Sequence, residues 1–337
     1  MKGIYTLAND AVYDQLIAFV NSVNMNIGEN MSICIIPYND KMDKIKEAIK
    51  DRPNVSIFND LEALEEWDRF CFKCWAAHPK DKASRWSRPR WYKTHNSREL
   101  VAFDGEFEEF VFFDADTLVM KPLDDVFEKL EQYDLVFDDW EHTKKDLSTQ
   151  LDIAQISQDQ CIPKSEIYPL LHCDSFFSSK KGIFSYKSLG FLSSELINNK
   201  KISWVKDHSW WSASALFCCM TLLANYRQFN FTQSEISQER TGNCADADPF
   251  VNLNNVLYNK EGLKPIHRIH YMNYSISQFR NLCNGIHEDV RYKDIFLHYR
   301  FLRNPEQNPS MLRRKNIWEL FNEKKHRLEN KVRRTLM

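Results

Sequence analysis

Two aspartates, Asp114 and Asp116, form the pattern in this chain that could most clearly do chemistry. They follow the apolar residues 110–113, which are typical of a buried strand. Alternate residues of a strand face the same way, so the two carboxylates are expected to point to one place, where they repel each other unless a cation lies between them. Carboxylate oxygens suit Mg²⁺ or Mn²⁺, which in turn binds a diphosphate. The pattern therefore predicts a metal site at the carboxyl end of a strand, where open α/β sheets bind ligands.

The Asp-x-Asp pattern is short, and Asp246-Ala247-Asp248 repeats it. A bare match is equally consistent with a capped loop that carries two solvated carboxylates. The elements around the pattern must therefore decide between a metal site and a loop.

The N-terminal third shows the alternation of strands and helices that is typical of a parallel α/β sheet. Residues 3–8, 31–38 and 54–58 are short apolar runs, and helical spacing follows the first two. Asn9 or Asp10 is expected to cap the first helix. The buried face of that helix is expected to comprise Val12, Leu16, Phe19, Val20 and Val23. With eight glycines and no G-x-G-x-x-G, the chain lacks the signature of a dinucleotide-binding turn.

Later elements are less regular. Strands are expected at 134–137, 173–179 and 265–272, and helices over 60–100, 123–130 and 204–226.

Composition excludes some functions. The 45 basic and 47 acidic residues give a net charge of −2, so no overall field points to a nucleic-acid partner. The longest apolar stretch, 213–224, is too short to span a bilayer, and the N-terminus resembles no signal peptide. The nine cysteines are scattered, and the lone Cys71-x-x-Cys74 is interpreted as buried thiols rather than a metal site. These features favour a cytoplasmic protein.

The residues around the first Asp-x-Asp carry a resemblance. FVFFDADTLVMKPLDDVF (110–127) is similar to the metal-binding segment of glycosyltransferase family 8, which includes glycogenin and bacterial lipopolysaccharide glucosyl- and galactosyltransferases. TLANDAVY (6–13) resembles the opening strand and turn of that family, and the likeness extends over about residues 2–275. The chain then looks like a divergent bacterial branch of the family.

The resemblance implies an α/β fold of the GT-A type, a Rossmann-like nucleotide-diphospho-sugar transferase with a mixed central sheet flanked by helices. It implies one catalytic domain over 1–303, with a nucleotide-binding half at about 1–140 and an acceptor half at about 141–303. Residues 304–337 are expected to form a basic helical tail.

It also implies roles for particular residues. Asp116 would be the principal metal ligand, Asp114 would contact both metal and ribose, and His270 would complete the site, with His267 as its rival. Tyr13 would stack on the base. The other implied nucleotide contacts are the backbone groups of Leu7, Ala8 and Asn9, and the phosphate-neutralising Lys93.

Two further aspartates, Asp174 and Asp248, would lie near the transferred sugar, although each could instead be a turn or cap residue. Asp174 belongs to a segment that resembles the sugar-facing strand of the family, and residues 245–258 are similar to a helix start that carries Asp248. Some family residues are replaced: Phe176 follows Asp174-Ser175 where a glycine is usual, Pro249 replaces a glutamine, and the Gly-x-Lys-Pro-Trp after the metal histidine is absent.

The expected function is metal-dependent transfer of a hexose from a UDP-sugar, with Mn²⁺ or Mg²⁺ and with retention of configuration. The acceptor would be a saccharide, a lipid-linked saccharide or a protein. A sugar nucleotidyltransferase and a non-catalytic glycan-binding protein are the alternatives. From Leu312 onward there are nine Lys or Arg against three Glu, so the tail could bind the inner face of an anionic membrane, and a solvated helix or a homo-oligomer contact is the alternative.

Overall fold

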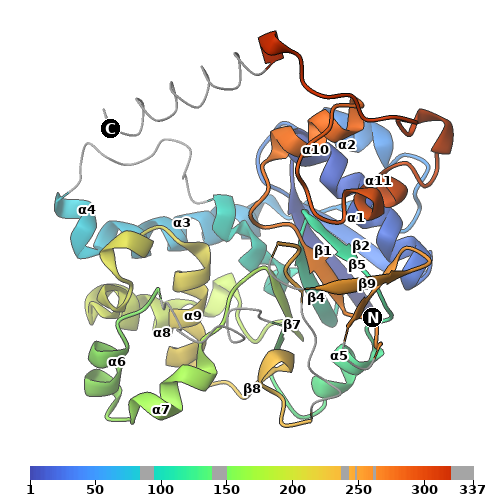
Figure 1. Cartoon of the computed structure of the whole chain (residues 1–337). Coiled ribbons are helices and arrows are strands. Elements are labelled where there is room, and N and C mark those ends of the chain that lie inside the picture. Colours follow the sequence, from blue (N-terminus) through green and yellow to red (C-terminus); the bar gives the residue numbers. More distant parts are fainter. Residues whose placement is uncertain (84–94, 139–149, 237–242, 247–248, 261–262, 320–337) are drawn as a thin grey trace.

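The apolar runs near the N-terminus form parallel strands of a seven-stranded sheet (Figure 1). Strand β7 runs antiparallel to both of its neighbours, β4 and β6, so the sheet is mixed, as expected. In spatial order the strands are β3 (Val55–Ile57), β2 (Ser32–Pro37), β1 (Lys2–Ala8), β4 (Glu109–Asp114), β7 (Phe176–Lys180), β6 (Leu135–Phe137) and β8 (Gln228–Asn230).

This structure is a computed structural model. It describes residues 1–83, 95–138, 150–236, 243–246, 249–260 and 263–319.

Both faces of the sheet are buried, and the central strands β1, β2, β4 and β6 are mostly apolar. Successive residues alternate between the two faces: Phe110 and Phe112 pack in one core cluster, and Val111 and Phe113 pack in the other. Helices α3 (Leu61–Ala77) and α9 (Ala213–Ala224) supply side chains to the first cluster. Helices α1 (Tyr13–Asn26), α2 (Asp43–Ala48) and α5 (Asp124–Lys129) cover the other face.

The predicted N-cap residues have separate partners. Asn9 accepts a hydrogen bond from the backbone N–H of Ala11 and so caps the 3₁₀ turn that leads into α1. Asp10 instead accepts from the backbone of Lys44 and Ile45, at 3.2 and 3.1 Å, and so caps α2. Asn9 and Asp10, which directly follow β1, thus connect the starts of the first two helices to the end of that strand.

A second layer of short strands lies over the carboxyl end of β4. Strand β5 (Thr117–Val119) pairs antiparallel with β11 (Arg268–His270), which brings a segment from the far end of the chain beside Asp116. Strands β9 (Phe250–Leu253) and β10 (Val256–Asn259) form a hairpin. The helix start expected over 245–258 is therefore wrong from Phe250 onward. Asn254 and Asn255 both adopt positive φ, at 55° and 67°, which suits a two-residue hairpin turn.

The remaining described α-helices lie in two groups. One group comprises α4 (Pro79–Ala83), α6 (Ile153–Gln160), α7 (Lys164–Ile167) and α8 (Gly190–Ser193). Helices α10 (Ile276–Cys283) and α11 (Lys293–Arg300) pack near α1. The helix expected over 204–226 begins only at Ala213, where the Ser212 side chain caps it.

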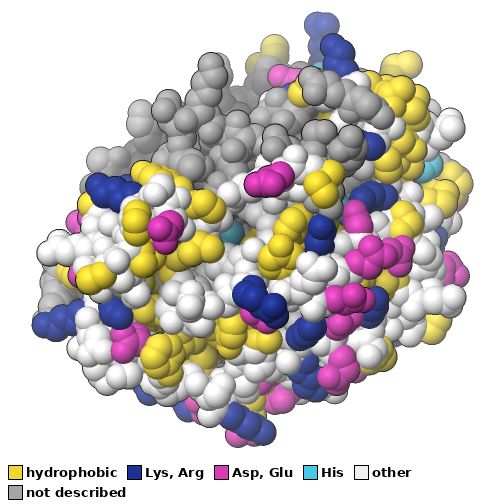
Figure 2. Space-filling model, turned by 90° about the horizontal axis from the view of Figure 1, so that it is seen from below, with side chains coloured by type: hydrophobic (Ala, Val, Ile, Leu, Met, Phe, Trp, Pro, Cys, Tyr) yellow, Lys and Arg dark blue, Asp and Glu magenta, His cyan; other side chains and the backbone are white. Residues whose placement is uncertain are grey.

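No helix among the described residues combines the length and apolarity needed to cross a bilayer. Cys71 and Cys74 are buried free thiols, and burial raises the pKa of each. On the face shown in Figure 2, acidic and basic side chains are interspersed, in keeping with a net charge close to zero.

Candidate active site

Three elements bring together the side chains of Asp114, Asp116 and His270. Asp114 is the last residue of β4, Asp116 lies in the turn between β4 and β5, and His270 ends β11 opposite Thr117. The backbone N–H of Tyr271 donates to the carbonyl of Asp116 at 3.0 Å, and this hydrogen bond holds the two segments together at this point. The carboxylates converge because the chain turns after Asp114, rather than because both residues lie on one strand.

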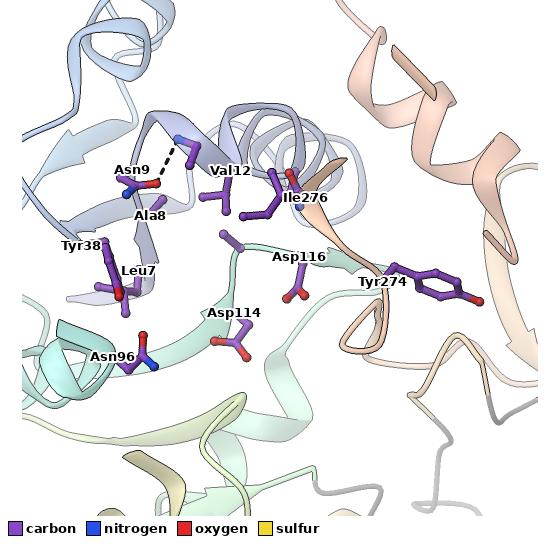
Figure 3. A pocket seen from close by; sticks show the side chains of 13 residues that line it. Leu7, Ala8, Asn9, Val12, Tyr38, Asn96, Asp114, Asp116, Tyr274 and Ile276 are labelled. Atoms are coloured by element: carbon purple, nitrogen blue, oxygen red, sulfur yellow. Dashed lines mark hydrogen bonds between the residues drawn. The ribbon is translucent and has the colours of Figure 1, made fainter. Parts of the chain in front are cut away.

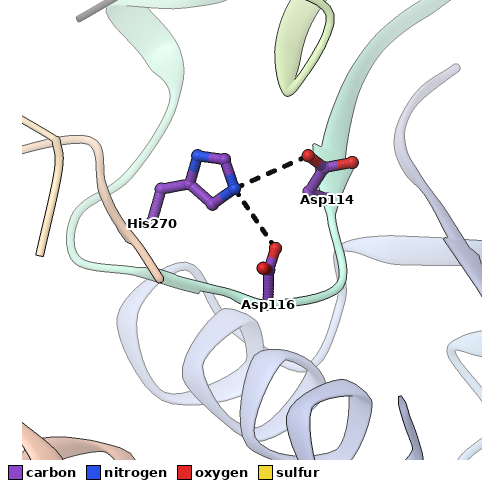
Figure 4. Close-up of side chains that lie close together, drawn as sticks. All are labelled: Asp114, Asp116 and His270. Carbon is purple, nitrogen blue, oxygen red and sulfur yellow. Dashed lines mark ion pairs between the residues drawn. The ribbon is translucent and has the colours of Figure 1, made fainter. Parts of the chain in front are cut away.

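The three side chains present their polar atoms to one another (Figure 4). The Nε2 atom of His270 lies 3.2 Å from Oδ1 of Asp116 and 3.6 Å from Oδ2 of Asp114. One ligand atom from each residue lies within 4.8 Å of the others. The histidine is buried, whereas the side chains of Asp114 and Asp116 are 37% and 27% exposed and so remain open to a ligand. Two carboxylates and one imidazole are a donor set that fits Mn²⁺.

The electrostatics of this cluster favour a bound cation. Burial and the neighbouring charge of Asp116 raise the pKa of Asp114 to about 7. Burial would also raise the pKa of Asp116, but the charge and hydrogen bond of His270 hold it below its usual range. The fully buried Arg268 also favours the ionised form of both aspartates. The Nη2 atom of Arg268 donates to the carbonyl of Asp138 and to Oγ of Ser175.

A pocket of about 470 Å³ adjoins the two aspartates (Figure 3). In this view Leu7, Tyr38 and Asn96 lie on one side of Asp114, and Asp116, Ile276 and Tyr274 lie on the other. None of the described residues that line the pocket is a Lys or Arg. The lining comprises Leu7, Ala8, Asn9, Ala11, Val12, Gln15, Tyr38, Asn96, Asp114, Ala115, Asp116, Tyr274 and Ile276.

The structure places the predicted nucleotide contacts in different positions. Leu7, Ala8 and Asn9 line the pocket together with the aspartates. Tyr13 is not among the lining residues, and Arg300 lies over its ring at 5.3 Å. Lys93 and Asp248 lie outside the described residues.

Tyr38 offers the pocket an aromatic ring that the sequence analysis did not single out. It follows the end of β2, and its ring meets that of His95 edge-on at 5.6 Å. Its carbonyl accepts a hydrogen bond from Arg98, whose guanidinium pairs with Asp68 at 2.7 Å. The residue is therefore held in place before any ligand arrives. Its position just after an apolar strand was the one sequence signal for it.

If UDP is the nucleotide, as the sequence analysis leads us to expect, Tyr38→Ala should weaken its binding by about tenfold or more, because stacking of a base on an aromatic ring is worth about 1–3 kcal/mol. Tyr13→Ala should leave binding within about twofold, since the ring is turned toward Arg300. Calorimetric titration of UDP in the presence of Mn²⁺ measures both. The opposite ranking of the two variants would return the stacking role to Tyr13.

Asp174 lies just before β7 and is paired with an acid that the sequence analysis missed. Its carboxylate is hydrogen-bonded to Glu99, which belongs to the 3₁₀ helix η2 (His95–Asp104) and is 3% exposed. Burial and the charges of Asp174 and Asp114 raise the pKa of Glu99 well above its usual range. The pKa of Asp174 is raised as well, so the pair is expected to hold a proton, and the larger rise for Glu99 assigns the donated hydrogen bond to Glu99. Nothing in the sequence around Glu99 distinguishes it from a surface acid.

For the metal-dependent turnover of a sugar nucleotide that the sequence analysis leads us to expect, Glu99→Gln should retain nearly all activity, because the amide N–H can donate to Asp174 as the carboxylic acid does. Glu99→Ala should lose about tenfold or more, since it leaves a partly buried carboxylate without that donor. The measurement is kcat for sugar-nucleotide turnover, with the melting temperature as the control for folding. Equal losses in the two variants would show that the donated hydrogen bond is not what matters.

His267, the rival metal ligand, lies elsewhere. Its ring is fully buried between two carboxylates, with Nε2 3.0 Å from Asp125 and Nδ1 3.3 Å from Asp138. Although burial lowers the pKa of His267, these two hydrogen bonds raise it overall. The structure thus brings His270, rather than His267, to Asp114 and Asp116.

No family model and no curated protein matches the chain at the level of sequence. Among solved structures, it is similar to the galactosyltransferase LgtC in complex with donor and acceptor sugar analogues, with a TM-score of 0.50 and 12% identity over 89% of this chain and 95% of that one. The fold is GT-A.

Other structures similar to this GT-A chain are also glycosyltransferases. The bifunctional glycosyltransferase WbbM matches with a TM-score of 0.44 and 13% identity, over 91% of this chain and 52% of that one. This chain therefore spans about half the length of WbbM. Mouse xyloside xylosyltransferase 1 matches with a TM-score of 0.41 and 8% identity, over 66% of this chain and 82% of that one.

Proposed function

We propose that this protein is a metal-dependent glycosyltransferase that transfers a hexose from a UDP-sugar, with retention of configuration, to a saccharide, lipid-linked or protein acceptor. The observation that carries the proposal is the convergence of Asp114, Asp116 and His270 at the rim of a pocket at the carboxyl end of β4. The GT-A fold supports it, because LgtC, a galactosyltransferase, has the same fold. The resemblance to family 8 supports the choice of a UDP-sugar and of retention.

The chemistry requires charge compensation at the leaving group. Cleavage of the bond between sugar and diphosphate leaves new negative charge on the diphosphate, and a divalent cation, when bound, would neutralise it as it develops. Asp114, Asp116 and His270 would hold that cation, here proposed to be Mn²⁺ or Mg²⁺. The described residues that line the pocket include no Lys or Arg, and Lys93, the predicted phosphate contact, lies outside the described residues.

The remaining residues would bind and orient the donor. Leu7, Ala8 and Asn9 would meet the nucleoside at the end of β1, and Tyr38 would stack on the base. Asp174, held by Glu99, would accept a hydrogen bond from a hydroxyl of the transferred sugar. Each of these roles orients the substrate relative to the two aspartates.

The experiment is release of nucleoside diphosphate from a panel of UDP- and GDP-sugars, with Mn²⁺ and with EDTA. Release from one UDP-sugar that EDTA stops would establish the transferase and name its sugar. UDP binding without release from any donor would favour a non-catalytic glycan-binding protein. Neither release nor metal-dependent binding of UDP would overturn the proposal.

A further inference from the structure

A strip of aromatic side chains that does not line the pocket runs from the end of α3 to the residues just before α9. The rings of Phe72 and Trp75, on α3, lie 6.4 and 5.8 Å from that of Trp211. The ring of Trp210 meets that of Trp211 edge-on at 5.0 Å, and the ring of His78 lies 6.3 Å from that of Trp210. Phe72 is 45% exposed and Trp210 is partly exposed. Large aromatic side chains that stay in contact with water at one place are typical of a binding surface.

The backbone at Trp211 has an unusual conformation. Its φ of 75° is rare for a residue with a bulky side chain, and such strained positions cluster at binding and active sites. Trp211 is 5% exposed and belongs to the first core cluster, whereas Trp210 packs against that cluster and stays partly exposed. The Nε1–H of Trp210 donates to the carbonyl of Trp75 at 3.3 Å. Because this polar group is already hydrogen-bonded, Trp210 can bind a ligand through the face of its ring.

The strip adjoins the residue that is proposed to bind the transferred sugar. Ser212 follows Trp211 directly and caps α9. In the first turn of α9, the hydroxyl of Ser214 donates to the carbonyl of His172 at 3.5 Å, and Asp174 follows His172 by two residues. The start of α9 is therefore joined to the segment that carries Asp174, and the second substrate of a transferase must lie beside the transferred sugar.

The chemistry of the strip suits a saccharide. The face of a sugar ring can present C–H groups that pack on an aromatic ring, while the hydroxyls at its edge need hydrogen-bond partners. Such partners lie next to Trp210, since Asp207 and His208 of the 3₁₀ helix η8 (Asp207–Ser209) are exposed. The carboxylate of Asp207 lies 4.0 Å from the ammonium of Lys80, and its side chain remains 73% exposed. A purely apolar partner would give these polar groups nothing in place of water.

We propose that Phe72, Trp210 and the exposed residues of η8 form a saccharide-binding surface, which holds the acceptor sugar beside Asp174. That the saccharide is the acceptor rests on the proposed function, whereas its binding to the strip does not. The strip includes none of the three proposed metal ligands, so saccharide binding should persist in EDTA.

The test is calorimetric titration of the full-length protein in EDTA with four disaccharides: lactose, maltose, cellobiose and chitobiose. We expect saturable binding of at least one of them. Trp210→Ala should weaken that binding by at least about tenfold, because the apolar face of the sugar no longer leaves water against an aromatic ring. Trp210→Phe should retain most of the affinity, since a ring remains at this position. A melting temperature for each variant controls for folding.

Trp318→Ala is the matched control, because it removes an exposed tryptophan, 75% accessible, that is not part of the strip. It should bind the disaccharide as the wild type does. Metal-dependent binding of UDP to the wild type is measured separately, so a failure of the saccharide site is distinct from a failure of the proposed function. The proposal is overturned if no disaccharide binds, or if Trp210→Ala and Trp318→Ala bind equally well. Sedimentation in which Trp210→Ala converts a dimer to a monomer would also overturn it, since the strip would then be a contact between copies.

Discussion

Replacing Asp116 with asparagine is expected to weaken Mn²⁺ binding by more than about 100-fold and to abolish metal-dependent release of UDP. Loss of a group that merely orients a metal ligand costs about 10–100-fold in affinity, and a direct ligand should cost more. Asp116 lies 3.2 Å from His270, and its pKa is held low, so its carboxylate is ionised and available. Calorimetric titration with MnCl₂, followed by the donor-hydrolysis assay, measures both effects.

The second Asp-x-Asp provides the control. Asp246 accepts a hydrogen bond from Asn273 at 2.5 Å and lies outside the cluster of Asp114, Asp116 and His270. Asp246→Asn should therefore bind Mn²⁺ as the wild type does. Unchanged metal affinity in Asp116→Asn, or equal losses in both variants, would contradict the assignment of the metal site.

The affinity for Mn²⁺ should also depend on pH. Burial and the charge of Asp116 raise the pKa of Asp114 to about 7, so below this value a proton occupies the carboxylate that the metal needs. Affinity should rise by up to about tenfold per unit as the pH increases toward 7, and then level off. The same titration, repeated across this range, measures it, and a flat profile would exclude Asp114 as a ligand.

His267→Gln is expected to lower the free energy of unfolding by about 3–5 kcal/mol, because it leaves the carboxylate of Asp138 buried without its ionic partner. Both side chains are fully buried, and Asn243 is left as a neutral donor to Asp138. Urea unfolding measures the loss. Asp125→Asn should cost less, since the side chain of Asp125 is 39% exposed and its charge is partly screened.

The contribution of His267 to the free energy of unfolding should decrease as the pH rises. The folded protein raises the pKa of His267 above its ordinary value of 6.5, so this contribution to stability is fully present below that value and is lost as the pH rises through the higher folded pKa. Asp125 behaves oppositely: its lowered pKa gives a contribution that is present above the ordinary range of an aspartate and lost in acid. In His267→Gln, the decrease in stability at alkaline pH should disappear. If the decrease persists in this variant, it arises from the titration of another group.

The first Asp-x-Asp could be identified as a candidate metal site because the sequence evidence for it is local. Four apolar residues identify β4, and ligands bind where such a strand ends. The third ligand could not be chosen in the same way. His267 and His270 lie three residues apart in one short segment. Only the pairing of β11 with β5, residue by residue, sets His270 beside Asp116 and His267 between Asp125 and Asp138.

The predicted nucleotide contacts likewise divide into those that the sequence indicates and those that only the tertiary structure decides. A turn rich in polar residues after β1 is visible in the sequence, and Leu7, Ala8 and Asn9 line the pocket. Which tyrosine faces the pocket depends on how α1 rotates against α11, and Arg300 covers the ring of Tyr13. Tyr38 and Glu99 come from segments more than 50 residues apart. Their positions near the candidate site arise from tertiary packing, and no local sequence pattern predicts them.

The order of apolar runs and helical patterns was enough to predict the α/β class, the buried strands and the place of the two aspartates, because periodicity and capping act over a few residues. Tertiary structure alone decided the reversed strand β7, the hairpin at 250–259, the approach of His270 rather than His267 to the two aspartates, and the pairing of Glu99 with Asp174. These features depend on contacts between residues distant in sequence, and on burial, which sets the energy of a charge only once the surrounding elements are in place.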